Sequence, residues 1–145
     1  MPVPTDPADH PALRRAAVVF ALGFLVHNAD HVRRHLGDIS EHVVWAGTVV
    51  AMVGAAVLTL IATRHPLAPF AAAAAGFGIA LGVTATHLLP QWSAFSDPLP
   101  GGEVDLATWV AVLAEVAGAL VLGASGLAIL RRDGYAVPRY QSVGA

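Results

Sequence analysis

Long apolar runs separated by short polar breaks form the main pattern along this chain. A helix needs about 20 apolar residues to cross the hydrocarbon core of a bilayer. Four segments reach that length: residues 12–36, 41–63, 68–89 and 104–130. The pattern therefore predicts an all-α fold, a four-transmembrane-helix bundle within residues 12–132, with residues 1–11 and 133–145 as tails.

The breaks between the runs carry signals that end one helix and start the next. The stretch GDISE (37–41) offers Asp38 as an N-cap with Glu41 three residues later, which predicts a capping box at the start of the second helix. RHPLAP (64–69) holds two prolines, typical of a helix end followed by a helix start. The Pro- and Gly-rich stretch PQWSAFSDPLPGG (90–102) predicts a loop about as long as a small lid.

Composition supports a membrane protein and removes several kinds of chemistry. Mean hydropathy is +0.64, and charged residues make up 12% of the chain, against roughly 25% in a soluble domain. A formal net charge of −2 gives no reason to expect a nucleic-acid partner. The chain has no cysteine, which excludes disulfides, thiol catalysis and iron–sulfur clusters. Its chemistry must therefore use His, Asp, Glu and Arg side chains.

The arginines predict the orientation, because cytoplasmic loops of membrane proteins are enriched in basic residues. With both termini inside, the cytoplasmic side receives six of the eight: Arg14, Arg15, Arg64, Arg131, Arg132 and Arg139. The outer side receives only Arg33 and Arg34. We therefore expect an N-in/C-in, multi-pass protein of the cell (inner) membrane.

Polar residues are concentrated near the expected outer side. The stretch LVHNADHVRRH (25–35) follows a purely apolar run, and its His27 and His31 are four residues apart, so they share one face of a helix. Asp30 lies on the flank of that face. With the orientation above, the histidines gathered in or near the outer leaflet are His27, His31, His35, His42 and His87.

Two further helices bring one ionisable residue each toward the same region. His87 continues a stripe of small residues at helical spacing on the third helix, namely Gly76, Ala80 and Thr84. Small residues let membrane helices approach closely, so this face is expected to point inward. On the fourth helix Glu115 lies near the bilayer midplane, where a charged side chain costs about 2.5–3.5 kcal/mol on insertion scales. It should face the bundle, protonated or paired.

These residue types predict a transition-metal site in an outer-leaflet pocket between the first, third and fourth helices, with the loop 91–102 folded over it. Histidines and carboxylates on inward faces of bundle helices suit Zn, Fe or Mn. The expected ligands are His27, His31 and His87, with Asp30 or Glu115 as the carboxylate. An open coordination position would activate water, and access from the bilayer would suit a lipid or quinone-like substrate.

Two alternatives stay open. A b-type haem needs one or two axial histidines on facing helices, and Gly23, Gly78 and Gly82 would make room for a ring. A cofactor-free protein could instead use the histidines and Glu115 as a proton relay or pH sensor, or could be a structural subunit of a membrane complex. In the plainest interpretation the histidines only satisfy one another and nearby backbone groups.

The remaining charged residues have structural interpretations. Arg33 and Arg34 are expected to pair with Asp30 or to reach lipid phosphates, while Glu41 and His42 are expected to serve the start of the second helix. A solvated acidic rim is expected from Asp97, Glu103 and Asp105.

The stretches HNADHVRRH (27–35) and HLLPQWSAFSD (87–97) together resemble a group of uncharacterised small four-span integral membrane proteins of high-GC bacteria. The resemblance covers residues 12–130. It implies a four-helix membrane fold and transfers no catalytic residue. The partners expected are membrane lipids and a homo-oligomer or larger membrane complex.

Overall fold

The computed structural model describes residues 10–34, 39–100 and 104–132. These residues form four helices and no strand: α1 (Pro11–Arg33), α2 (Glu41–Ala62), α3 (Ala68–His87) and α4 (Leu106–Arg132). Each helix is long and apolar enough to cross a membrane. The predicted all-α bundle of four membrane-spanning helices is therefore confirmed, and the architecture is that of a multi-pass membrane protein.

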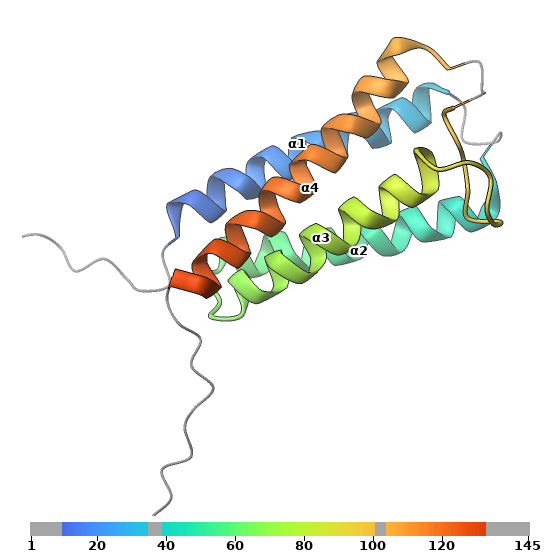
Figure 1. Cartoon of the computed structure of the whole chain (residues 1–145). Coiled ribbons are helices and arrows are strands. Elements are labelled where there is room, and N and C mark those ends of the chain that lie inside the picture. The colour runs from blue at the N-terminus through green and yellow to red at the C-terminus, as the bar shows by residue number, and fades with distance from the viewer. Residues whose placement is uncertain (1–9, 35–38, 101–103, 133–145) are drawn as a thin grey trace, which may run out of the picture.

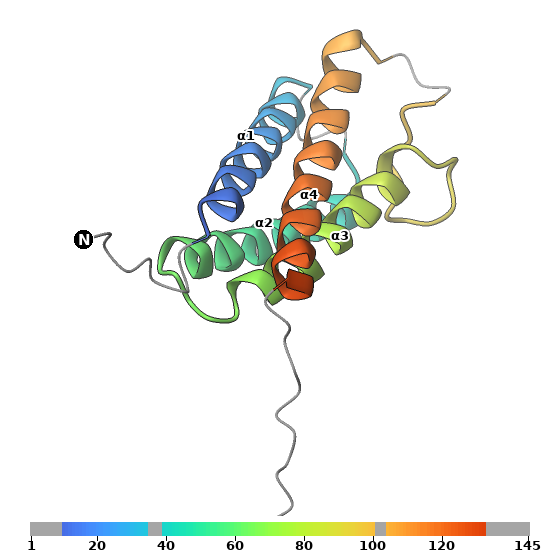
Figure 2. The same ribbon diagram turned by 60° about the vertical axis from the view of Figure 1, so that its left-hand side comes forward.

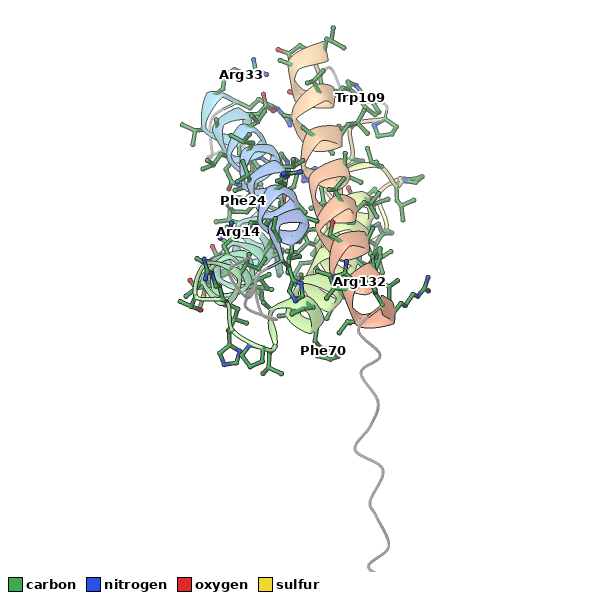
Figure 3. All side chains as sticks on the ribbon, turned by 90° about the vertical axis from the view of Figure 1, so that its left-hand side faces the viewer. Arg14, Phe24, Arg33, Phe70, Trp109 and Arg132 are labelled. Atoms are coloured by element: carbon green, nitrogen blue, oxygen red, sulfur yellow. The ribbon has the colours of Figure 1, made fainter. Side chains whose placement is uncertain are left out.

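The four helices are not packed equally. α4 lies closely along both α1 and α3, whereas α2 packs on α3 and touches α1 at few points. Figures 1 and 2 show α1 and α4 side by side, with the start of α1 and the end of α4 at the same end of the bundle. The described part of the loop after α3 lies at the other end (Figure 1). Figure 3 shows Arg33 and Trp109 toward that end, and Arg132 and Phe70 toward the opposite one.

Glycines explain the close packing of α4. A Cβ atom added to Gly23 of α1 would lie 2.5 Å from the carbonyl oxygen of Ala114, and one added to Gly126 would lie 2.5 Å from that of Pro69 on α3. Neither distance is possible for a real side chain, so the absence of a Cβ lets the backbones meet. Membrane helices use small residues for this purpose because lipid supplies no hydrophobic force to hold them together.

The bundle exposes apolar side chains and buries a few ionisable ones. The outer faces carry exposed apolar side chains such as Leu22, Met52 and Leu81. The buried side chains include Asp30 and Glu115, which are 6% and 1% exposed. A bilayer suits the exposed apolar surface, and the buried ionisable groups must find partners inside the protein.

The start of α2 differs from the predicted capping box. The helix begins at Glu41, so Glu41 is its first residue and not its third, and the N-cap is Ser40. The Ser40 hydroxyl accepts a hydrogen bond from the backbone N–H of Val43 at 3.3 Å and donates one to the carbonyl oxygen of Ala94 at 3.1 Å. Ser40 thus ties the start of α2 to the loop. Asp38 lies outside the described residues.

Candidate metal centre

Three buried or half-buried histidines converge from two helices. His27 and His31 stand one turn apart on α1, and His87 is the last residue of α3. Their ring centroids are 4.5 Å (His27–His31), 4.9 Å (His27–His87) and 5.5 Å (His31–His87) apart. One nitrogen from each ring lies within 4.8 Å of the others, a spacing that could hold a single metal ion.

Glu115 of α4 holds the ring of His27. Its carboxylate Oε2 is hydrogen-bonded to His27 Nδ1, and both residues are buried. The pair is brought together by the glycine contacts between α1 and α4, since a Cβ on Gly118 would lie 2.9 Å from the Cα of Phe20. With Nδ1 engaged, Nε2 is the nitrogen that remains for other partners, and this buried atom has no hydrogen-bond partner.

The loop after α3 holds the ring of His87. His87 Nδ1 donates to the backbone carbonyl of Asp97 at 3.0 Å, and the His87 carbonyl accepts from the backbone N–H of Leu99 at 2.8 Å. A further bond joins the Asp97 N–H to the carbonyl of Thr86 at 2.9 Å. The ring of His87 is therefore fixed from its Nδ1 side, and Nε2 is the nitrogen not used by this hydrogen bond.

Asp97 is a component of the site that the sequence interpretation missed. Its Oδ2 atom lies 3.6 Å from His87 Nδ1 and 3.9 Å from Arg34 Nη1, and this buried atom has no hydrogen-bond partner. The expectation that Asp97 belongs to a solvated acidic rim is therefore wrong. The only signal in the sequence was its place ten residues after His87, in a loop expected to fold over the pocket.

Asp30 is not one of the converging ligand residues. Its Oδ1 accepts from Arg33 Nε at 2.9 Å, and Arg33 also binds the Asp105 carboxylate and donates to the Thr108 hydroxyl at 3.1 Å. This network joins the end of α1 to the start of α4, as the structural interpretation of Arg33 expected in part.

Asp105 precedes α4 and serves its first turn. The carboxylate accepts from the backbone N–H of Thr108 at 3.0 Å. This hydrogen bond first, and the Arg33 guanidinium second, lower the pKa of the Asp105 carboxyl. Asp105 is thus a helix cap and ion-pair partner, and not simply part of an acidic rim. Glu103 lies outside the described residues.

A cavity of about 70 Å³ opens beside the three histidines. Glu115 also lines it, and α2 supplies an apolar wall: Val43, Ala46, Gly47 and Val50. All four helices therefore build the pocket, whereas the sequence predicted three. One water needs roughly 10–15 Å³ of such space, so the cavity has room for an ion with a few water molecules.

Of the other two histidines in the expected outer group, only His42 is described, and it is not part of the site. His42 is exposed, and its ring meets Phe95 edge-on with centroids 5.6 Å apart. His35 lies outside the described residues. At the opposite end of the bundle, His65 Nδ1 accepts from the backbone N–H of Leu67 at 3.2 Å.

Comparisons with known proteins give no analogy for this arrangement. No family model, curated protein or solved structure matches the chain.

Proposed function

We propose that this chain is a membrane-embedded transition-metal protein whose ligands are His27, His31 and His87. One observation carries the proposal: the three rings converge, and two of them have Nδ1 engaged by an acceptor, which leaves Nε2 as the nitrogen able to bind a metal. Metal-ligating histidines usually donate their second N–H to a carboxylate or a backbone carbonyl, which fixes the tautomer and the ring orientation. Glu115 and the Asp97 carbonyl supply one acceptor of each kind.

In this proposal the carboxylates act beside the ligands. Glu115 orients His27 and offsets the charge of a cation held by three neutral imidazoles, and Asp30 serves Arg33. Imidazole donors suit Zn and Fe, whereas Mn prefers carboxylate oxygens. Among the described residues, no carboxylate oxygen belongs to the group of converging ligand atoms. Zn and Fe are therefore favoured over Mn.

A three-histidine set leaves coordination positions open. A metal bound in this way supplies Lewis acidity, polarising an oxygen of a water or another ligand. The chain contributes the fixed rings, the buried carboxylate of Glu115 and apolar walls that keep bulk water out. Such a metal would act on an oxygen-bearing group small enough to reach the cavity.

Haem is less well supported than a single ion. Of the glycines expected to make room for a ring, Gly23 packs against α4, and Gly78 and Gly82 lie exposed with no atom within 4 Å of an added Cβ. None of them therefore widens the space at the histidines.

Elemental analysis and an absorption spectrum of the protein purified in detergent test the proposal. We expect about one Zn or Fe per chain and no Soret band. His27→Ala and His87→Ala should each abolish the bound metal, and His65→Ala should retain it. Metal at 100 times its Kd stabilises the fold by about 2.7 kcal/mol, so the two ligand variants should also melt lower. A metal-free parent that melts like its histidine variants would refute a metal site.

A metal-free result would favour the second candidate, a proton relay. Its support is the buried pair of Glu115 and His27 in contact with two further imidazoles, a chain of groups able to pass a proton. It would then predict that Glu115→Gln changes proton flux in vesicles without changing any metal content.

We further propose that the protein lies in the cell (inner) membrane with both termini in the cytoplasm, supported by the six-to-two distribution of arginines. A single cysteine at the exposed Gln91 should then react with a membrane-impermeant maleimide in intact cells. Ser96 is unsuitable for this purpose because it is buried. Labelling that occurs only after permeabilisation would show that the protein has the opposite orientation.

A further inference from the structure

The weak contact between α1 and α2 leaves an apolar groove along the bundle. Its upper part, which includes Asn28, His31 and Val43, has a volume of about 330 Å³. Its lower part, which includes Phe20, Phe24 and Leu58, has a volume of about 230 Å³. Ala51 lines both parts. We call these two parts together the α1–α2 groove. On α2 it runs from Val43 to Leu58, roughly 20 Å at about 1.5 Å per residue.

The groove shares walls with the histidine cavity. His31 and Asn28 line both the cavity and the upper part, and Phe24 lines both the cavity and the lower part. A molecule lying in the groove would therefore have one end beside the candidate metal ligands. The opening lies between two membrane-spanning helices, so a molecule entering sideways comes from the lipid and not from water.

The groove is polar at one end and apolar at the other. The upper part contains His31, whose buried Nδ1 has no hydrogen-bond partner, and the Asn28 side chain. The lower part is lined entirely by apolar residues: Phe20, Ala21, Phe24, Leu25, Ala51, Gly54, Ala55 and Leu58. Among the residues that the structure describes, no Arg, Asp or Glu side chain lines either part. This favours an uncharged headgroup over a phosphate, which would need a cation.

We propose that the α1–α2 groove binds a single-tailed lipid with an uncharged carbonyl or hydroxyl headgroup. The tail lies along Phe20, Phe24 and Leu58, and the headgroup oxygen meets the imidazole of His31 at the mouth of the histidine cavity. The proposal names a ligand class for the metal site and in that respect rests on the proposed function. The volumes of the two parts fall in the range of small-molecule sites, about 300–1,000 Å³ when taken together.

Blocking the groove without touching the cavity tests the proposal. Ala51 lines both parts of the groove but not the histidine cavity, so Ala51→Leu fills the groove and leaves the ligands in place. The matched control is Ala74→Leu on an exposed position of α3. A second blocking variant is Ala55→Leu, because Ala55 lines the lower part of the groove and not the histidine cavity.

The probes are a benzoquinone with a ten-carbon tail and 1-decanol, added to metal-loaded protein in detergent. Quinone binding is measured by quenching of tryptophan fluorescence, and decanol binding by competition with the quinone. We expect saturable quinone binding that weakens about tenfold or more in Ala51→Leu and Ala55→Leu and is unchanged in Ala74→Leu. Decanol that competes indicates a general oxygen-headed lipid, and decanol that does not compete indicates a quinone-type ligand.

Metal content measured on the same samples separates the two proposals. Groove binding lost in Ala51→Leu with metal retained supports the lipid site. Groove binding in a parent that carries no metal would keep the lipid site and refute the metal centre. No saturable binding of either probe to metal-loaded protein, or equal binding by Ala51→Leu and Ala74→Leu, would overturn the lipid site alone.

Discussion

α1 meets its two neighbours in opposite ways. Against α4 its backbone is in direct contact at Gly23, and polar side chains join the helix ends through Arg33. Against α2 it leaves a groove lined by apolar side chains such as Phe24 and Leu58. The side of α1 that faces α4 is in backbone contact with that helix, and we call it the closed edge. The side that faces α2 borders the groove, and we call it the open edge.

The two edges serve different parts of the site. His27 is bound to Glu115 on the closed edge, while His31 lines the open groove. A metal site needs ligands whose side chains are already held in the binding geometry, so that the metal binds without a rearrangement of the protein. A ligand arriving from the membrane needs a path. If the proposed metal centre and lipid site are both present, packing α1 tightly on one side and loosely on the other provides for both.

The largest expected effect breaks the closed edge. Gly23→Leu places a Cβ 2.5 Å from the Ala114 carbonyl oxygen, and since that neighbour is backbone, α1 must move away from α4. We expect a loss of about 3 kcal/mol of stability together with loss of bound metal, measured by thermal unfolding in detergent and elemental analysis. Gly78→Leu on the exposed face of α3 is the control. Equal melting of the two variants would show that the helices do not meet at Gly23.

A smaller effect is expected from removing charge at the closed edge while keeping its shape. Glu115→Gln retains an oxygen that accepts from His27 but loses the negative charge. Loss of a partner that orients a ligand typically costs 10–100-fold in metal affinity, so we expect a decrease of about that size with the fold intact. Glu41→Gln, at an exposed position of α2, should bind like the parent. Unchanged affinity in Glu115→Gln would mean that Glu115 is a protonated packing residue.

The smallest effect concerns pH and the polar join between α1 and α4. The pKa of Asp105 is lowered by the Thr108 N–H and then by Arg33, so the folded protein holds this proton less tightly than the unfolded chain. The ionised carboxylate therefore stabilises the fold above the ordinary aspartate pKa of about 3.9, and the contribution disappears as the pH falls through the lowered value. The melting temperature of the parent should fall below about pH 4 by slightly more than that of Asp105→Asn, which keeps a capping oxygen. Parallel pH curves would contradict this role.

Hydropathy was sufficient to predict the four helices, because the length of a membrane span depends mainly on bilayer thickness. The same reasoning predicted that Glu115 faces inward, since lipid exposure of a carboxylate costs too much. The start of α2 was less predictable. Asp38 and Ser40 are both good N-caps, and the contact of Ser40 with Ala94 on a distant loop is not visible in the local sequence.

The geometry of the site was predictable only where helical periodicity controls it. The spacing of four residues placed His27 and His31 on one face, and a stripe of small residues marked the inner face before His87. Asp97 comes from a loop whose path has no periodicity, so its approach to His87 could not be read from spacing. The apolar wall from α2 was also missed, because no polar residue marks Gly47 or Val50 as facing the site.

The pairing of α1 with α4 has a consequence for how the protein is made. His27 and Glu115 are 88 residues apart in the chain, yet they satisfy each other. Since a ribosome makes α1 well before α4, the imidazole enters the membrane without its partner and stays so while α2 and α3 are inserted. A charged carboxylate within the bilayer costs about 2.5–3.5 kcal/mol. Because pairing with His27 reduces this cost, the newly inserted α4 is expected to pack against α1. The His27–Glu115 pair therefore forms only when α4 inserts, and until then the polar face of α1 is without this partner.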